Sequence, residues 1–144
     1  AVGLAQLEKI DELVEARRHN AYLYNYCLKK VKGIVLPPEK NWAKNVYWMY
    51  GILVKEAEFG MSMKQLMSKL KKKGIDTRTF FIGMHKQPAY NKKEPHFPDQ
   101  TECPIAEILE SDGLYLPSSS HLTAEQIEFI TDSIKEAQKN AFNK

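Results

Sequence analysis

The sequence predicts an α+β domain, in which a small, mainly antiparallel sheet packs against a long N-terminal helix and a C-terminal helix. Two observations support this prediction. Apolar residues recur at helical spacing near both ends of the chain. Between these regions lie short runs of β-branched and aromatic residues, bounded by glycine and proline. A chain of 144 residues is long enough for one domain with a substantial core.

Residues 1–31 are expected to form one helix. Its apolar positions are Leu4, Leu7, Ile10, Val14, Ala21, Tyr24, Leu28 and Val31. At a rise of 1.5 Å per residue the helix would be about 45 Å long, which exceeds the ~30 Å width of a small domain. The chain also opens on helical sequence without a capping residue. We therefore expect a missing body of protein before this helix. Without it, an apolar strip around Leu4, Ala5 and Leu7 should be exposed.

Residues 34–36 and 46–54 are the first two predicted strands. The first is a short apolar run that Pro37 and Pro38 end. The second is apolar at both sets of alternating positions, which predicts a central strand covered on both faces. We expect its aromatic side chains in the core, because no basic residues alternate with them.

A second helix is predicted to begin after Ser62. Gln65 follows three residues later, which is the pattern of a capping box, and Met61 and Leu66 occupy the positions of a hydrophobic staple. Leu66, Met67 and Leu70 should face inward. The helix is expected to end at Gly74, a residue suited to the left-handed conformation that follows many helices.

Residues 77–82 are β-branched and aromatic, and they predict a strand. The loop after them carries His85, Gln87 and Tyr90, three hydrogen-bonding side chains within six positions. Polar and aromatic side chains at the exit of a strand often form a ligand-facing surface. An ordinary turn at Gln87–Pro88 is the plainer interpretation.

The remaining elements follow a loop at residues 91–101, which we expect on the surface. A short helix is predicted over residues 105–110 and a strand over 114–116. Thr123 and Gln126 form a second capping box at the start of the last helix. The buried stripe of this helix is expected to be Ile127, Ile130 and Ile134.

Composition argues against several classes of protein. The hydrophobic share of 43% and the charged share of 27% are typical of a soluble globular protein. A net charge of +3 is too small to indicate a nucleic-acid partner. Cys27 and Cys103 make no disulfide framework, which favours the cytoplasm, and no apolar run is long enough for a membrane span. The cysteines and the four histidines lack metal-ligand spacing, so no metal is expected.

Three segments resemble one family. They are G-I-D-T-R-x-F-F-x-x-M-H-x-Q-P-A-Y from Gly74, G-L-A-Q-L-E-K-I-D-E-L-V-E-A-R-R from Gly3, and G-L-Y-L-P-S from Gly113. They are similar to the small domain of the DegT–StrS sugar-nucleotide aminotransferases, vitamin B6 enzymes, and most similar to the perosamine-synthase branch. Thr79 departs from that branch, in which proline is common at this position. The resemblance implies that residues 1–144 are the C-terminal small domain of a fold-type I aminotransferase, and that the cofactor-binding large domain is absent.

The resemblance also implies an activity for the whole enzyme. It would transfer an amino group, from glutamate, to a GDP-linked 4-keto-6-deoxy sugar, and it would work as a homodimer in amino-sugar and polysaccharide biosynthesis. Pyridoxal phosphate (PLP) chemistry needs a Schiff-base lysine and an aspartate, and in the family both belong to the missing domain. We therefore expect no catalytic, cofactor-binding or metal-binding residue in this chain, and no activity from it alone.

Within the resemblance, Arg78 and His85 are the principal candidate substrate contacts. A guanidinium suits a diphosphate, and a histidine can donate to a phosphate or sugar oxygen. Phe81 could wall the cleft, Gln87 and Tyr90 are weaker candidates, and the neighbouring Lys86 is expected to point to solvent.

Plainer interpretations remain open. Arg78 could form a surface salt bridge with Asp76 or Glu58, and His85 could simply lie in a turn. The lysine-rich stretch 64–73 is typical of a solvated helix face, but it also allows a free-standing basic module that binds acidic partners. Such a module would lose binding steeply as salt is added.

Overall fold

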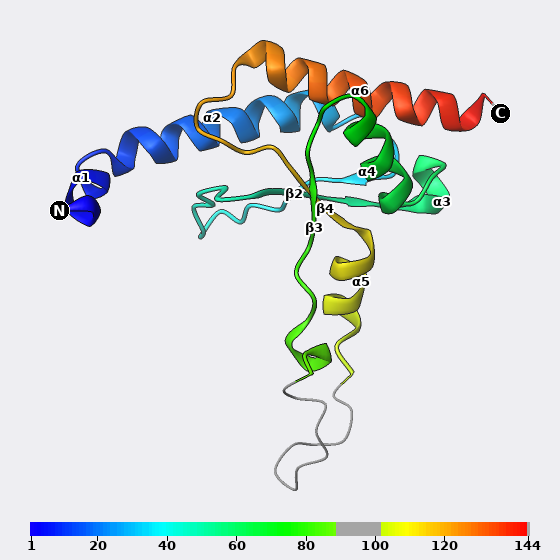
Figure 1. The fold of residues 1–144 in the computed structure, drawn as a ribbon, viewed down its shortest axis with the longest axis horizontal. Helices are drawn as coiled ribbons and strands as arrows, with labels where there is room; N and C mark the ends of the chain where they lie inside the picture. Colours follow the sequence, from blue (N-terminus) through cyan, green and yellow to red (C-terminus); the bar gives the residue numbers. More distant parts are fainter. Residues whose placement is uncertain (89–101, 144) are drawn as a thin grey trace, which may run out of the picture.

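The computed structural model of the chain describes residues 1–88 and 102–143. Its centre is a four-stranded sheet in the order β1-β2-β4-β3, and each neighbouring pair is antiparallel. The strands are β1 (Ile34–Val35), β2 (Tyr50–Val54), β3 (Arg78–Thr79) and β4 (Gly113–Leu116). The predicted α+β class is confirmed, and β2 is a central strand as expected (Figure 1).

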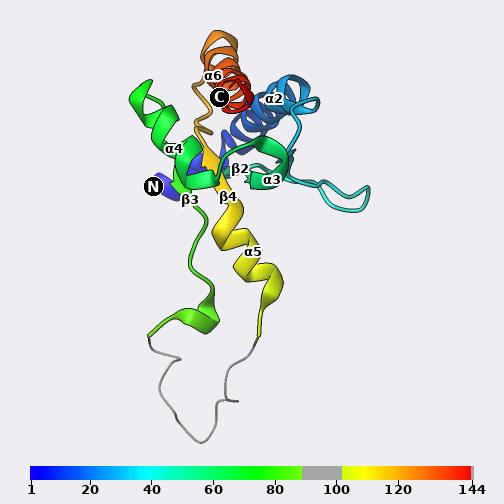
Figure 2. The same ribbon diagram turned by 90° about the vertical axis from the view of Figure 1, so that its right-hand side faces the viewer.

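The long helices gather on one side of this sheet. Helices α2 (Ile10–Leu28) and α6 (Ala124–Phe142) pack against each other, and α4 (Met63–Lys72) packs against α6 and β4. Figures 1 and 2 show α2 and α6 side by side above the sheet. The shorter elements are α1 (Val2–Leu7), α3 (Glu56–Phe59), α5 (Pro104–Asp112) and the 3-10 turn η1 (Met84–Lys86).

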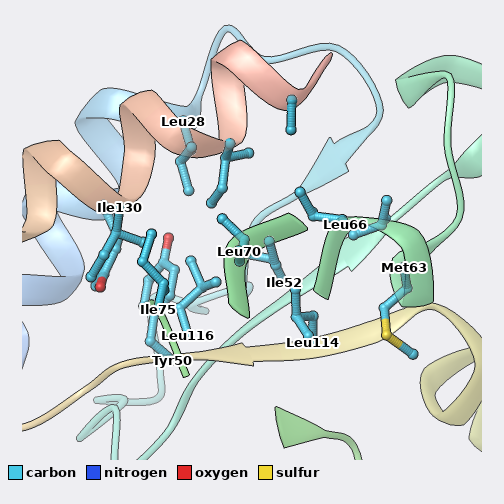
Figure 3. Packing of buried hydrophobic residues seen from close by; sticks show 14 of the residues in the cluster. Leu28, Tyr50, Ile52, Met63, Leu66, Leu70, Ile75, Leu114, Leu116 and Ile130 are labelled. Atoms are coloured by element: carbon cyan, nitrogen blue, oxygen red, sulfur yellow. The ribbon is translucent and has the colours of Figure 1, made fainter. Parts of the chain in front are cut away.

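The core lies between these helices and the sheet. Tyr50, Ile52 and Val54 of β2 are buried, whereas the alternating Gly51 and Leu53 are half-buried. The sequence predicts that β2 is covered on both faces. The face toward the long helices is fully buried, whereas the opposite face is only half-buried. Figure 3 shows the buried cluster, whose labelled members include Leu28, Leu66, Leu70, Leu114, Leu116 and Ile130.

Residues 46–49 lie outside β2, although the apolar run predicted a strand from residue 46. Tyr47 has a positive φ of 47°, which is incompatible with an extended strand. Arg18 of α2 holds this segment by donating hydrogen bonds to the backbone oxygen of Asn45 and to the carboxylate of Glu39. Tyr47 is buried as expected, but Trp48 is 67% exposed, so its prediction as a core residue is wrong.

The first helix is interrupted at Glu8 and Lys9, where α1 ends and α2 has not begun. All residues from 1 to 10 are exposed, so no tertiary packing supports a continuous helix there. Leu4 and Leu7 are 63% and 65% exposed, which confirms the expected apolar strip. Helix α2 ends at Leu28, three residues before the predicted end.

Both predicted capping boxes are present. The side chain of Ser62 accepts a hydrogen bond from the backbone N–H of Gln65, and Thr123 does the same for Gln126. Each glutamine side chain accepts a hydrogen bond from the backbone N–H of its capping residue. Ile127, Ile130 and Ile134 form the buried stripe of α6 as expected.

The strand predicted over residues 77–82 is much shorter in the structure. Only Arg78 and Thr79 pair with β4, opposite Tyr115 and Leu114. β4 begins at Gly113 directly after α5, so Phe81 and Ile82 have no strand to pair with. The chain therefore leaves the sheet after Phe80.

Candidate substrate-contacting site

A pocket of about 460 Å³ opens between the edge of the sheet and the first turns of α6. Three segments that are distant in sequence form its walls: residues 74–78, residues 115–119, and the N-terminal part of α6. This volume lies within the usual range for small-molecule sites. We call it the β3–α6 pocket. The residues that line it are Met49, Gly74, Ile75, Asp76, Thr77, Arg78, Tyr115, Leu116, Pro117, Ser118, Ser119, Leu122, Gln126, Phe129 and Ile130.

Helix α2 holds the wall formed by residues 117–119. Tyr24 Oη donates to the backbone oxygen of Pro117 at 2.9 Å, and Asn20 Nδ2 donates to that of Ser119 at the same distance. Arg17 Nη1 donates to the oxygen of Ser118 at 3.1 Å. Burial raises the pKa of the Tyr24 hydroxyl, so this group stays protonated and remains a donor. The wall is thus fixed by three consecutive carbonyl contacts.

Arg78 is the cationic residue that lines this pocket. Its side chain is exposed, and no ion pair involves it among the described residues. Glu58, a possible partner on sequence grounds, lies 3.6 Å from Lys55. The alternative interpretation, a salt bridge of Arg78 with Asp76 or Glu58, is therefore not found among the described residues. A free guanidinium in a pocket of this size can contact an anionic ligand.

After β3 the chain forms an arm that projects from the sheet, as Figures 1 and 2 show. We use "the arm" for residues 80–88 and 102–112. At its base the ring of Phe80 stacks on that of Tyr115, with centroids 4.2 Å apart. Gly51 and Gly113 make room for Phe80, since a Cβ on either would lie 2.4–2.6 Å from its ring atoms.

His85 lies in the η1 turn of the arm and contacts α5. Its Nε2 is 3.3 Å from Glu107 Oε1, and its side chain is only 16% exposed. Lys86 Nζ is 3.3 Å from Glu110 Oε2. Lys86 is exposed as expected, but it also forms this ion pair. Sequence reasoning missed Glu107 and Glu110, whose signal was their spacing of three residues on a helix.

The structure does not bring all the predicted contact residues together. Phe81 is 71% exposed, and its ring centroid is 6.2 Å from that of Tyr115, which also lines the β3–α6 pocket. Gln87 lies farther along the arm and donates from Nε2 to the backbone oxygen of Ile82. Tyr90 lies outside the described residues. Arg78 thus lines the pocket and Phe81 lies at the base of the arm near Tyr115, whereas His85 and Gln87 lie farther along the arm.

The described residues do not suit PLP. The cofactor requires a lysine for the Schiff base and an aspartate for its ring nitrogen. Asp76 lines the β3–α6 pocket, but no described lysine does. In the described ranges we find no cluster of potential metal ligands, and no helix there has the length and apolarity needed to cross a bilayer.

The lysine-rich stretch is partly used within the fold. Lys73 Nζ is 2.5 Å from Glu136 Oε2, which connects the end of α4 with α6. Lys64, Lys71 and Lys72 are exposed. This arrangement is that of an ordinary solvated helix face with one tertiary ion pair.

The chain is similar to known aminotransferases. A model of the DegT/DnrJ/EryC1/StrS aminotransferase family matches residues 1–135. The chain is 36% identical over 137 residues to the GDP-perosamine synthase of Escherichia coli O157:H7, covering 94% of this chain and 34% of that protein. It is 30% identical over 145 residues to the Vibrio cholerae GDP-perosamine synthase, covering 99% of this chain and 36% of that protein.

Solved structures share the fold. The crystal structure of S. venezuelae DesV in complex with a ketimine intermediate matches with a TM-score of 0.82 and 26% identity. The match covers 96% of this chain and 35% of that chain. The chain spans about a third of the length of the curated relatives above.

Proposed function

Because the chain belongs to the DegT/DnrJ/EryC1/StrS aminotransferase family, we propose that it is the C-terminal small domain of a PLP-dependent sugar-nucleotide aminotransferase. The observation that carries this proposal is the family match over residues 1–135. A chain about a third as long as its relatives, with no lysine in its β3–α6 pocket, would leave the cofactor to the rest of such an enzyme.

The substrate that we propose is a GDP-linked 4-keto-6-deoxy sugar, with glutamate as the amino donor. The 36% and 30% identities to two GDP-perosamine synthases support this choice over other sugar nucleotides. Such an enzyme would work in the cytoplasm as a homodimer, in amino-sugar and polysaccharide biosynthesis, without a nucleic-acid or membrane partner. PLP, when bound by the large domain, would supply the amino-group chemistry.

In this proposal the small domain contributes part of the substrate cleft. Arg78 would contact the diphosphate, because its guanidinium is exposed in the β3–α6 pocket and free of ion pairs among the described residues. Phe81 would wall the cleft near Tyr115. His85, Gln87 and Tyr90 would add polar contacts from the arm and the segment after it.

The experiment that tests the function uses the complete reading frame that contains this chain. The purified product is incubated with glutamate and GDP-4-keto-6-deoxymannose, and the amino sugar and 2-oxoglutarate are measured. We expect both products in equal amounts. A dTDP-linked 4-keto-6-deoxy sugar serves as the control for nucleotide choice. A complete protein that carries lysine-bound PLP but aminates neither sugar would refute the proposal.

A further inference from the structure

The imidazole of His85 lies between two groups that define its position. On one side is the backbone of Gly83, where an added Cβ would lie 2.6 Å from Cε1 and 2.8 Å from Nδ1 of the ring. On the other side, Glu107 Oε1 lies 3.3 Å from Nε2. We infer that Glu107 is a positioning residue, which orients the His85 ring and thereby sets which ring nitrogen carries the proton.

The chemistry of the contact determines the tautomer. A carboxylate only accepts hydrogen bonds, so Nε2 must donate. In a neutral imidazole the proton then resides on Nε2, and Nδ1 is left as an acceptor. Nδ1 is the nitrogen closer to Gly83, where no side chain competes for the space. Glu107 therefore fixes both the orientation and the hydrogen-bonding character of the ring.

Glu110 lies one helical turn after Glu107 on α5 and contacts the same η1 segment. Its Oε2 lies 3.5 Å from the backbone nitrogen of Gly83, which donates to it, and 3.3 Å from Lys86 Nζ. Lys86 Nζ is also 3.9 Å from Glu107 Oε1. The two acidic side chains lie on one face of α5 because they are three residues apart. Together they connect residues 83–86 of the arm to helix α5.

The arm needs such contacts because it has left the sheet. Residues 81–88 of the arm pair with no strand in the described structure, and the short η1 turn contributes few backbone hydrogen bonds. Side-chain contacts with α5 must therefore define the turn. Only the role of His85 as a substrate contact rests on the proposed function. The contact between Glu107 and the His85 ring lies within this chain.

The test compares Glu107→Ala, Glu107→Gln and the control Glu128→Ala, which changes an exposed glutamate of α6. Imidazole ¹⁵N shifts of His85 at a pH where the ring is neutral report the tautomer, and solvent exchange of the Lys86 and Gln87 amides reports the turn. We expect Glu107→Ala to produce a mixture of tautomers and to raise exchange about two- to fivefold, the range for exposed ion pairs. Glu107→Gln retains an acceptor oxygen but adds an amide donor, so it should restore the Nε2–H tautomer only in part.

Two results separate this inference from the proposed function. An unchanged His85 tautomer in Glu107→Ala would overturn the positioning role, whatever the enzyme's activity. In the complete enzyme, the KM for sugar nucleotide should rise about two- to fivefold in Glu107→Ala and recover in part in Glu107→Gln. A changed tautomer with an unchanged KM would support the positioning role and refute the assignment of His85 as a substrate contact.

Discussion

Replacing Arg78 with alanine tests the proposed substrate site most directly, because the fold depends little on this side chain. Arg78 lies on the edge strand β3, is exposed, and makes no ion pair among the described residues. Surface substitutions of this kind usually change the free energy of unfolding by less than about 0.5 kcal/mol. A loss of ligand affinity would therefore report a lost contact with the ligand.

The expected loss follows from the charge of the ligand. A hydrogen bond to a charged group is worth about 1.5–3 kcal/mol, and a diphosphate would form one with the Arg78 guanidinium. Losing it should weaken sugar-nucleotide binding about ten- to 150-fold. Arg78→Lys should recover only part of the affinity, because an ammonium cannot reproduce the planar, two-pronged contact. His85→Ala should raise the KM for sugar nucleotide more than that for glutamate.

The assay is calorimetric titration of the complete enzyme with GDP, together with the KM values for sugar nucleotide and glutamate. Lys64→Ala is the control, because this lysine is exposed on α4, away from the pocket lining. Lys86→Ala is unsuitable because Lys86 pairs with Glu110. Unchanged sugar-nucleotide binding in Arg78→Ala and His85→Ala, with circular dichroism showing an intact fold, would refute the site but not the family assignment.

Four further predictions concern the chain itself. The isolated chain should neither bind PLP nor transaminate, and a cofactor absorbance band that survives dialysis and is lost on mutating one of its lysines would contradict this. The exposed strip at Leu4 and Leu7 should cause self-association in sedimentation experiments, which Leu7→Glu should reduce and a monomeric wild-type chain at high concentration would rule out. Thr123→Ala should lower the free energy of unfolding in urea by about 1 kcal/mol, whereas Thr123→Asn should preserve the cap. Hydrogen bonds from Arg18 and the Asn45 backbone lower the pKa of Glu39. The stability that these bonds contribute is complete above the ordinary pKa of 4.5 and is lost as the pH falls through the lowered pKa. The midpoint of thermal unfolding between pH 6 and 3 should therefore depend less on pH in Glu39→Gln.

Features that depend on neighbouring residues could be predicted from the sequence alone. Both capping boxes, at Ser62 and Thr123, formed as predicted because their partners lie three residues away. The buried stripe of α6 followed from helical periodicity. Gly74 adopts a φ of 78° after α4, as its position predicted. The fold class followed from the order of these local elements, and the family from motifs spread along the whole chain.

The extent of each strand was decided by tertiary structure. Phe81 has strong strand propensity, yet β3 ends before it, because the partner strand β4 begins directly after a helix. Trp48 is apolar and lies next to a core strand, yet it is exposed because Tyr47 adopts a positive φ. Strand pairing requires a second segment from elsewhere in the chain, and the sequence of one segment does not contain that information.

The candidate site depends on tertiary structure for the same reason. The sequence identified Arg78 and His85 through a local motif, but only the fold placed Arg78 beside residues 115–119 and His85 against Glu107. These contacts join residues 22 or more positions apart in the chain. Local spacing determines helices and caps through bonds over three or four residues, whereas pockets and ion pairs form only when the core brings distant segments together.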